Sequence, residues 1–303
     1  MSTESSLRIL LIEDDSAYAE FVEAMLQGTS SVRVAVDCVP LLRSAVDCLA
    51  EHAYDIALVD LGLPDARDLE ALTTLVAVVP ELPVVILSSM GDEQLALRAV
   101  KSGAQDYLTK DSVTPELLVR AIRYAIERKQ SELQIKQLAY YDSLTKLPNR
   151  LLLLEHLGLA LRRAARTGSI VGVFFIDIDR FKQVNDAYGH ETGDRVLAQL
   201  ASRLSNSLRR SDTLGRLSGD EFVAVVDADQ TSELEVVAES LRRAMEGPIA
   251  TEGGQLFTTA SVGVSTFPAD GNEVEELLRS ADRAMYRSKA RGRDTVSFSF
   301  RDA

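Results

Sequence analysis

The sequence predicts an α/β protein of two domains: an N-terminal domain with a doubly wound, parallel, five-stranded sheet and a C-terminal α/β domain, joined by a long helix. Two observations lead to this prediction. Short apolar runs alternate with amphipathic helical segments through residues 1–125, which is typical of a parallel sheet covered by helices on both faces. The chain of 303 residues is also long enough for two hydrophobic cores of ordinary size. We expect the first domain at 1–125, a helical linker at 126–141 and the second domain at 142–303.

The first domain is expected to contain five strands and five helices. The predicted strands are Leu7–Ile12, Val32–Val36, Ile56–Val59, Val84–Leu87 and Tyr107–Leu108. The predicted helices begin near Tyr18 and at Leu41, Leu69, Gln94 and Leu117. In a parallel sheet of this kind, functional side chains collect at the carboxyl ends of the strands.

Polar residues stand at those strand ends. Glu13 and Asp14 follow the first strand, Asp60 ends the third, Ser88 ends the fourth, and Lys110 follows the fifth. Any one of them alone is equally well explained as a helix cap or a solvated strand end. Carboxylates that meet at one edge, however, need a divalent cation or a lysine to offset their repulsion. The five residues together therefore predict a functional site.

The first domain resembles the receiver domain of two-component response regulators over residues 7–125. The resemblance implies that Asp60 accepts a phosphoryl group from a histidine kinase, and that Glu13 and Asp14 hold one Mg²⁺ (or Mn²⁺) together with it. The residues that it assigns to phosphoryl contact and switching are Lys110, Ser88 and Tyr107. Receivers usually have a proline after the lysine. Because Asp111 stands there instead, we expect an altered loop with intact acceptor chemistry.

A polar, helix-favouring segment leads out of the first domain. Thr114 and Pro115 suit an N-cap and a first helical residue, and no Gly or Pro interrupts the chain from there to Tyr141. One interpretation is a solvated terminal helix. The sharper one is a helix of roughly 25 residues within 113–141 that pairs with the same helix of a second copy and so forms a homodimer.

The second domain is expected to alternate helices and strands around a short acidic hairpin. Its predicted strands are Ile170–Ile176, the two arms of the hairpin, Thr258–Phe267 and Thr295–Phe300. Its predicted helices lie near 154–165, near 196–208, after a Ser232/Glu235 capping box, and at Val274–Arg291.

The hairpin is the segment Arg216–Phe222, which joins two apolar runs and is predicted to turn at Ser218-Gly219. Its adjacent carboxylates, Asp220 and Glu221, repel each other and disfavour a strand. Taken alone, they are best interpreted as a solvated acidic turn. Asp177 changes this interpretation, because it ends another predicted strand. If the two strands are neighbours, these carboxylates can share Mg²⁺ ions with a nucleoside triphosphate.

Other polar residues of the second domain suit the same ligand. Lys182, Lys289 and Arg293 offer positive charge to phosphates, and Asn185 and Asp194 offer hydrogen bonds to a purine edge. The chain has no Gly-rich P-loop followed by Lys and Ser or Thr, which excludes a P-loop NTPase.

The second domain resembles GGDEF diguanylate cyclases along its full length. Those enzymes join two GTP molecules into cyclic di-GMP and release pyrophosphate, and they work as dimers with two GTP-loaded domains face to face. The resemblance implies two Mg²⁺ (or Mn²⁺) per site, and the metal ligands that it implies are Asp177, the Ile178 carbonyl, Asp220 and Glu221. The catalytic residues that it implies are Asp220, Glu221 and Lys182. The residues that it assigns to the nucleotide are Asn185, His190, Asp194, Arg216, Ser218, Gly219, Lys289 and Arg293. Arg209 and Asp212 match the product-inhibition site of the family.

Ser218 departs from the family, which usually has glycine at this position. If the turn requires a positive φ here, serine costs roughly 1 kcal/mol relative to glycine. We expect retained activity, with a cost in rate or in GTP binding.

Composition sets limits on location and partners. Net charge is −13; residues 1–140 hold 22 acidic and 12 basic side chains, and residues 141–303 hold 24 and 21. The acidic first half argues against a nucleic-acid partner, and the arginine clusters of the second half suit a polyanion. Cys38 and Cys48 are too few for a disulfide scaffold, so we expect a reducing compartment and two buried thiols. There is no apolar run of roughly 18 residues and no signal-peptide pattern, and we expect a cytoplasmic protein without membrane contact.

The two resemblances together predict a response regulator whose output is cyclic di-GMP synthesis. In this hypothesis, phosphorylation of Asp60 rearranges a dimer and brings two catalytic domains together. Two alternatives stay open. One is an effector in which Ser218 disables catalysis while Arg209 and Asp212 bind cyclic di-GMP. The other is a GTP-binding interaction module controlled by phosphorylation.

Overall fold

The computed structural model describes residues 7–29, 33–89, 92–251 and 254–299. The chain divides into two compact units, Met1–Ile135 and Lys136–Ala303. Among the described helices, none combines the length and the apolar character that a membrane span requires.

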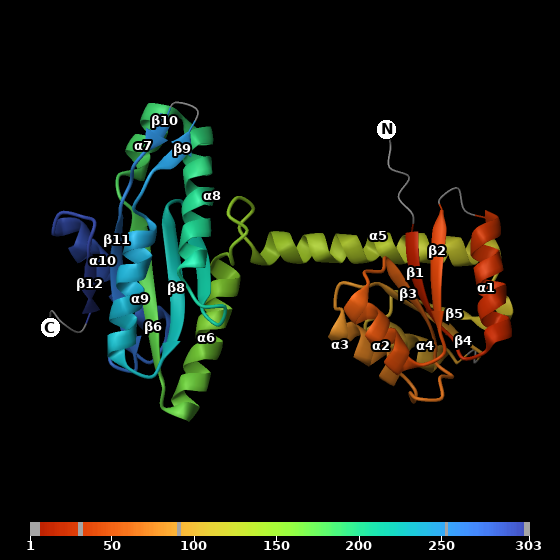
Figure 1. Ribbon diagram of the computed structural model, residues 1–303. Helices are drawn as coiled ribbons and strands as arrows, with labels where there is room; N and C mark the ends of the chain where they lie inside the picture. The colour runs from red at the N-terminus through yellow and green to blue at the C-terminus, as the bar shows by residue number, and fades with distance from the viewer. Residues whose placement is uncertain (1–6, 30–32, 90–91, 252–253, 300–303) are drawn as a thin grey trace. The chain divides into compact units, whose positions relative to one another are not determined.

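The first unit is a parallel sheet with helices on both faces (Figure 1). Its strands are β1 (Leu7–Ile12), β2 (Val34–Val39), β3 (Ile56–Asp60), β4 (Val84–Ser88) and β5 (Asp106–Thr109), in the order β2-β1-β3-β4-β5. Its helices are α1 (Ser16–Thr29), α2 (Leu42–Glu51), α3 (Glu70–Val78), α4 (Glu93–Lys101) and α5 (Pro115–Tyr140), with a short helical turn η1 (Lys110–Ser112) before α5. Every residue of β3 and β4 is buried, as expected for central strands that are covered on both faces. The predicted fold class is confirmed.

Each face of this sheet has its own apolar cluster. Helices α1 and α5 pack on one face through residues such as Val22 and Ile122. Helices α2, α3 and α4 pack on the other through residues such as Leu72 and Ala99. The cores hold the strand ends in place, and the polar residues at those ends form the site described below.

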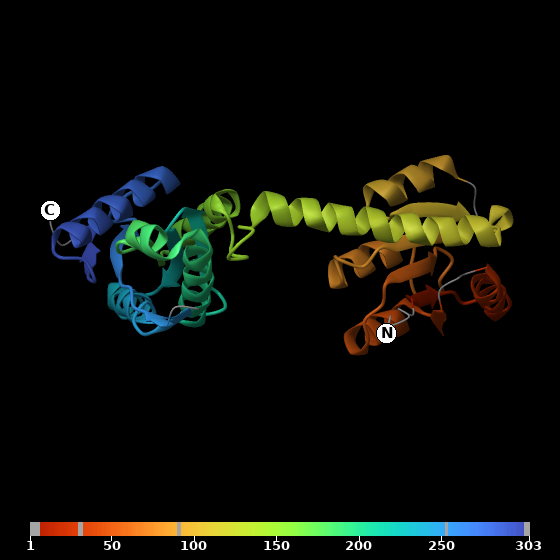
Figure 2. The same ribbon diagram turned by 90° about the horizontal axis from the view of Figure 1, so that it is seen from above.

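Helix α5 is one unbroken element (Figure 2). The Thr114 hydroxyl accepts a hydrogen bond from the Leu117 amide at 3.3 Å, which confirms the predicted N-cap. Toward the end of this helix, the side chains of Ile135 and Leu138 are exposed.

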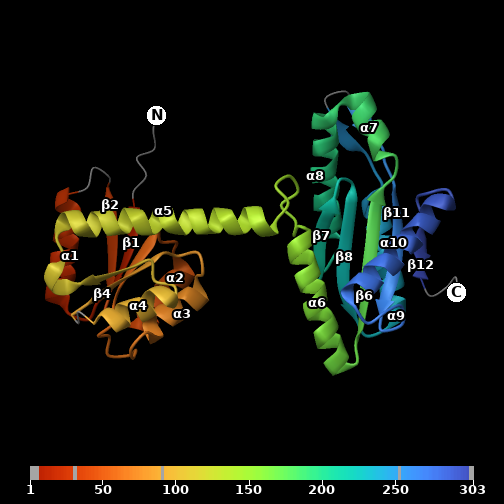
Figure 3. The same cartoon turned by 180° about the vertical axis from the view of Figure 1, so that it is seen from behind.

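The second unit has a mixed sheet in the order β12-β11-β6-β8-β7. Its strands are β6 (Ile170–Ile178), β7 (Thr213–Ser218), β8 (Glu221–Ala228), β11 (Ala260–Phe267) and β12 (Val296–Phe298). A separate small hairpin consists of β9 (Ile249–Thr251) and β10 (Gly254–Leu256). Helices α7 (Phe181–Tyr188), α8 (His190–Asn206) and α9 (Thr231–Ala244) cover one face. Helices α6 (Arg150–Thr167) and α10 (Val274–Ala290) cover the other (Figure 3).

Several details differ from the sequence predictions. Cys38 is exposed and Cys48 half-buried, so the prediction of two buried thiols was wrong; Cys38 lies on the edge strand β2, where side chains reach solvent. Helix α9 begins at Thr231 after Gln230, without a side-chain cap, so the Ser232/Glu235 capping box was also wrong. The hairpin of β9 and β10 was not predicted, because three-residue strands leave no usable periodicity. The predicted strand start at Val32 and strand end at Phe300 lie outside the described residues.

Candidate functional site

Strand pairing brings the predicted carboxylates of the second domain together. Asp177, near the end of β6, lies opposite Glu221 at the start of β8. The Ile178 amide donates a hydrogen bond to the Asp220 carbonyl at 3.3 Å. Asp177 is buried, and Asp220 and Glu221 are half-buried. The strands that carry these residues are therefore neighbours, which was the condition for a shared acidic site.

The hairpin turns one residue later than predicted. Ser218 pairs with Glu221, so the two loop residues are Gly219 and Asp220, and Gly219 has a φ of 49°. Ser218 is not among the described residues with positive φ. The register shifts between Arg216 and Ser218, which moves the turn along the chain. The predicted turn at Ser218-Gly219 was therefore wrong, and the backbone strain that such a turn would impose on Ser218 is absent.

The Ser218 hydroxyl has a specific partner instead. It donates a hydrogen bond to the Glu221 carboxylate at 2.7 Å. Glu221 is thus held by a side chain that glycine at position 218 cannot offer.

Arg216 connects the hairpin tip to the start of the domain. Its Nε and Nη2 donate to the Gly219 carbonyl at 2.9 and 2.7 Å, and its Nη1 donates to the Asp142 carboxylate at 2.9 Å. Burial raises the pKa of Asp142, but hydrogen bonds from Thr145 and Arg216 outweigh it and hold the pKa below its usual range. Arg216 was predicted to contact the nucleotide, and Asp142 was not predicted as a site residue. No local pattern indicates a pair 74 residues apart.

The acidic site is electrostatically costly. Burial is the main cause that raises the pKa of Asp177 to about 6; Lys289 opposes the shift, and the nearby charges of Asp220 and Glu221 add to it. Lys289 Nζ lies 2.7 Å from Asp177 Oδ2. Burial also raises the pKa of Asp220. Buried carboxylates of like charge, offset by one ammonium group, form a donor set that a divalent cation would stabilise.

The carboxylate oxygens of this acidic site lie farther apart than those of the acidic cluster in the first domain. In the described part of the chain, the group of carboxylates whose ligand atoms lie within 4.8 Å of one another is Glu13, Asp14 and Asp60. In the second domain, Asp177 pairs with Lys289 and Glu221 accepts a hydrogen bond from Ser218. The donor chemistry fits Mg²⁺ in both places.

Helices α7 and α8 carry the residues predicted to contact a purine. Asn185 Oδ1 is buried without a hydrogen-bond partner among the described residues. A Cβ atom at Gly193 would lie only 1.9 Å from this oxygen, so any other residue there would displace the Asn185 side chain. Lys182, His190 and Asp194 are exposed on the same two helices. Because buried polar atoms are usually hydrogen-bonded, an amide oxygen without a protein partner is available to a ligand that donates a hydrogen bond.

The remaining cationic residues lie in two further places. Arg293 is exposed in the turn after α10 and has a φ of 69°. The Arg209 amide donates to Asp212 Oδ2 at 2.9 Å, beside a hollow of about 420 Å³ that His156 also lines. The sites of Arg209 and of the acidic strand ends thus use different residues.

The strand ends of the first domain converge as predicted. Lys110 Nζ lies 2.7 Å from the Glu13 carboxylate and 2.9 Å from that of Asp60. Glu13, Asp60 and Ser88 are buried, whereas Asp14 is exposed. Burial raises the pKa of Glu13, and hydrogen bonding to Lys110 opposes this effect.

The loop after β5 forms the helical turn η1, in which Asp111 is the central residue. Tyr107, on β5, is half-buried and packs against the cluster of α2, α3 and α4. Tyr18, which was not predicted as a site residue, has its ring centre 4.5 Å from Lys110 Nζ. Tyr18 was interpreted only as an apolar helix position, and its place four residues after Asp14 was the available indication.

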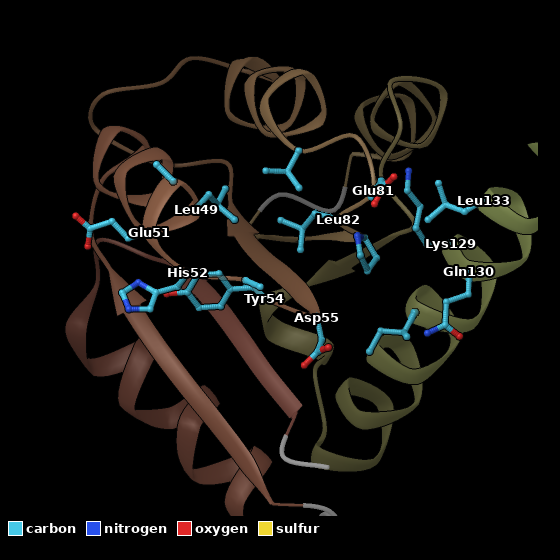
Figure 4. A pocket seen from close by; sticks show the side chains of 15 residues that line it. Leu49, Glu51, His52, Tyr54, Asp55, Glu81, Leu82, Lys129, Gln130 and Leu133 are labelled. Atoms are coloured by element: carbon cyan, nitrogen blue, oxygen red, sulfur yellow. The ribbon is translucent and has the colours of Figure 1, made fainter. Parts of the chain in front are cut away.

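The first domain also has a groove of about 610 Å³ away from this site (Figure 4). His52, Tyr54 and Asp55 line one wall, and Lys129 and Leu133 of α5 line the other. The groove lies at the amino end of β3, whereas Asp60 lies at the carboxyl end of this strand.

Comparison with known families and proteins agrees with these features. Residues 139–295 match the family "Diguanylate cyclase, GGDEF domain", and residues 9–123 match the "Response regulator receiver domain". The response regulator PleD of Caulobacter vibrioides is 30% identical over 307 residues, which cover 95% of this chain and 65% of PleD. The diguanylate cyclase TpbB of Pseudomonas aeruginosa is 40% identical over 158 residues, which cover 51% of this chain and 36% of TpbB.

Among solved structures, the coiled coil and GGDEF domain of DgcB from Caulobacter crescentus, in complex with cyclic di-GMP, match with a TM-score of 0.55 and 26% identity. The match covers 60% of this chain and 98% of that one. The chain spans less than two thirds of the length of the two curated relatives. The chain belongs to the GGDEF diguanylate cyclase family and carries a response regulator receiver domain ahead of its GGDEF domain.

Proposed function

We propose that this protein is a diguanylate cyclase that joins two GTP molecules into cyclic di-GMP, releases pyrophosphate, and is regulated by its receiver domain. One observation carries the proposal: the pairing of β6 with β8 places Asp177 beside Glu221 and Asp220, in a domain of the GGDEF family. PleD, a response regulator, supports the combination with a receiver.

The acidic strand ends are proposed to hold two Mg²⁺ ions, or Mn²⁺, through Asp177, the Ile178 carbonyl, Asp220 and Glu221. When bound, these ions would activate the attacking hydroxyl and offset the charge of the phosphates. The raised pKa values of Asp177 and Asp220 support this assignment, because a bound cation favours the ionised carboxylates.

The residues of the chain have separate proposed tasks. Lys182 stabilises charge that develops on the transferring phosphoryl group, and Lys289 and Arg293 bind phosphate oxygens. Lys289 must then exchange its contact with Asp177 for a phosphate. Asn185 Oδ1, which has no hydrogen-bond partner among the described residues, accepts a hydrogen bond from the guanine, and His190 and Asp194 also contact the nucleotide. Arg216 and Gly219 hold the hairpin tip in place, and Ser218 orients Glu221.

Regulation is proposed to start at Asp60. Glu13 and Asp14 would hold one Mg²⁺ with it, and Lys110 would pair with the phosphoryl group that a histidine kinase supplies. Ser88 and Tyr107 would respond to the new charge. Helix α5 would then shift a homodimer toward an arrangement in which two GTP-loaded domains meet.

The test of catalysis compares single acidic variants. We expect Asp177→Asn and Glu221→Gln each to lower cyclic di-GMP and pyrophosphate release from GTP and Mg²⁺ by about 100-fold or more. Asp229→Asn removes an exposed carboxylate at the other end of β8 and is expected to keep the parental rate. Parental rates in Asp177→Asn would overturn the proposal.

A cyclic di-GMP effector is the second candidate, because Arg209 and Asp212 lie together apart from the acidic strand ends. In the cyclase, the same pair is proposed to bind the product and inhibit the enzyme. A parent protein that binds cyclic di-GMP through Arg209 but makes none from GTP would favour the effector.

A further inference from the structure

The turn after α10 has an unusual backbone. Gly292, Arg293 and Asp294 have successive φ values of 115°, 69° and 45°. Glycine adopts a positive φ without penalty, but in arginine and aspartate the Cβ atom crowds the backbone. Such conformations persist where surrounding contacts impose them, and they are frequent at ligand-binding sites.

Two contacts impose this conformation on Asp294. Its amide donates a hydrogen bond to Asp179 Oδ2 at 3.1 Å, and its carboxylate accepts one from Arg242 Nη1 at 2.7 Å. We call these two contacts the Asp294 clamp. The Arg293 amide adds a bond to the Ser288 carbonyl at 3.1 Å, which joins the turn to the end of α10.

Both partners in the clamp are themselves fixed. Asp179 is 6% exposed and accepts hydrogen bonds from the Thr259 and Ser261 hydroxyls at 2.6 and 2.7 Å. The Arg242 side chain is 16% exposed and also pairs with Glu239 and Glu246. The clamp therefore ties the turn to β6, β11 and α9 at once.

The clamp also fixes the turn relative to the acidic strand ends. Asp179 lies two residues after Asp177, and Lys289, four residues before Arg293, pairs with Asp177 at 2.7 Å. Arg293 is thus held between two attachments to the same end of β6. A relaxed turn would free an exposed arginine that has several rotatable bonds, and a phosphate would then have to order it on binding.

We propose that Arg242 and Asp294 are positioning residues that hold the strained turn and so direct the Arg293 guanidinium toward the triphosphate of the substrate. This inference rests on the proposed function, in which Arg293 binds phosphate. The clamp acts on binding of the phosphates and leaves recognition of the purine to α7 and α8.

The experiment measures equilibrium binding of 3′-deoxy-GTP, which lacks the attacking hydroxyl, and of guanosine, which lacks phosphates. We expect Asp294→Ala and Arg242→Ala to weaken 3′-deoxy-GTP binding by about tenfold and to leave guanosine binding unchanged. With GTP, the same variants should raise KM more than they lower kcat. Asp294→Gly should recover part of the loss, because glycine adopts the turn without strain.

Arg243→Ala is the matched control. Arg243 lies next to Arg242 on α9 and shares its partner Glu239, and no contact with Asp294 is recorded for it in the described part of the chain. It should bind 3′-deoxy-GTP like the parent. Parental 3′-deoxy-GTP binding by Asp294→Ala would overturn the proposal, as would an equal loss of guanosine binding or an equal effect of Arg243→Ala.

The binding measurements do not need turnover, so the two proposals can fail separately. If the parent makes no cyclic di-GMP but the clamp variants lose triphosphate binding, the proposed cyclase activity fails and the clamp stands. If the parent is active and the clamp variants bind 3′-deoxy-GTP normally, the clamp fails alone.

Discussion

The burial of Asp177 predicts a pH-dependent stability of the second domain that Asp177→Asn should lack. The Asp177 side chain is 9% exposed. Burial raises its pKa from 3.8 to about 6. Because the folded pKa lies above the unfolded value, the folded state binds the additional proton in this window. Stability is then lost as pH rises from 3.8 to about 6, and it stays lower above that range.

The size of the effect follows from the shift. About 2 pKa units correspond to about 3 kcal/mol, of which about 2 kcal/mol falls between about pH 4.5 and about pH 8. Asparagine has no charge to desolvate. In metal-free protein, the unfolding free energy of Asp177→Asn relative to that of the parent should therefore increase by about 2 kcal/mol from about pH 4.5 to about pH 8. Added Mg²⁺ should reduce the difference, because it favours the ionised carboxylate.

The assay is urea unfolding in the presence of a chelator. At each urea concentration, pulsed hydrogen exchange of peptides from β6 and β8 measures the unfolded fraction. These peptides report on the second domain alone. The difference between variant and parent removes the titration of all other groups. A difference in unfolding free energy that does not change with pH would refute the reasoning.

Three further predictions concern single contacts. Asp142→Ala leaves the partly buried Arg216 guanidinium without its carboxylate and should lower the unfolding free energy of the second domain by about 3 kcal/mol, and an unchanged urea midpoint would contradict this. Tyr18→Leu removes the ring beside the Lys110 ammonium and should slow phosphorylation by acetyl phosphate about threefold. Tyr18→Phe keeps the ring face and should be phosphorylated at the parental rate. Equal rates in the two variants would count against the contact. Ser218→Ala removes the hydrogen bond that orients the hairpin glutamate and should raise the Mg²⁺ concentration for half-maximal activity about threefold, so an unchanged metal requirement would exclude this role.

The alternation of apolar runs was sufficient to predict the parallel sheet and its carboxyl-end site. Asp60 and Lys110 are 50 residues apart, yet Asp60 ends one strand and Lys110 follows another, and the carboxyl ends of parallel strands meet at a common edge. The same reasoning identified Asp177 and Glu221, on the condition that their strands are neighbours. That condition depends on the strand order, which local patterns do not determine.

The errors in prediction arose where tertiary contacts override local preference. The hairpin was expected to turn at Ser218, but the irregularity before it moves the turn to Gly219 and Asp220. The ion pair of Arg216 joins distant segments and leaves no periodic pattern. The Asp179 carboxylate likewise joins β11 to the turn after α10, two segments that no local pattern connects.

The central claim is that the receiver controls synthesis of cyclic di-GMP. The most direct test incubates the protein with GTP and Mg²⁺, with and without beryllofluoride as a mimic of phosphorylated Asp60, and quantifies cyclic di-GMP. We expect the product to rise with beryllofluoride in the parent and to be unaffected by it in Asp60→Asn. Absence of product under both conditions, or the same response in Asp60→Asn as in the parent, would contradict the account.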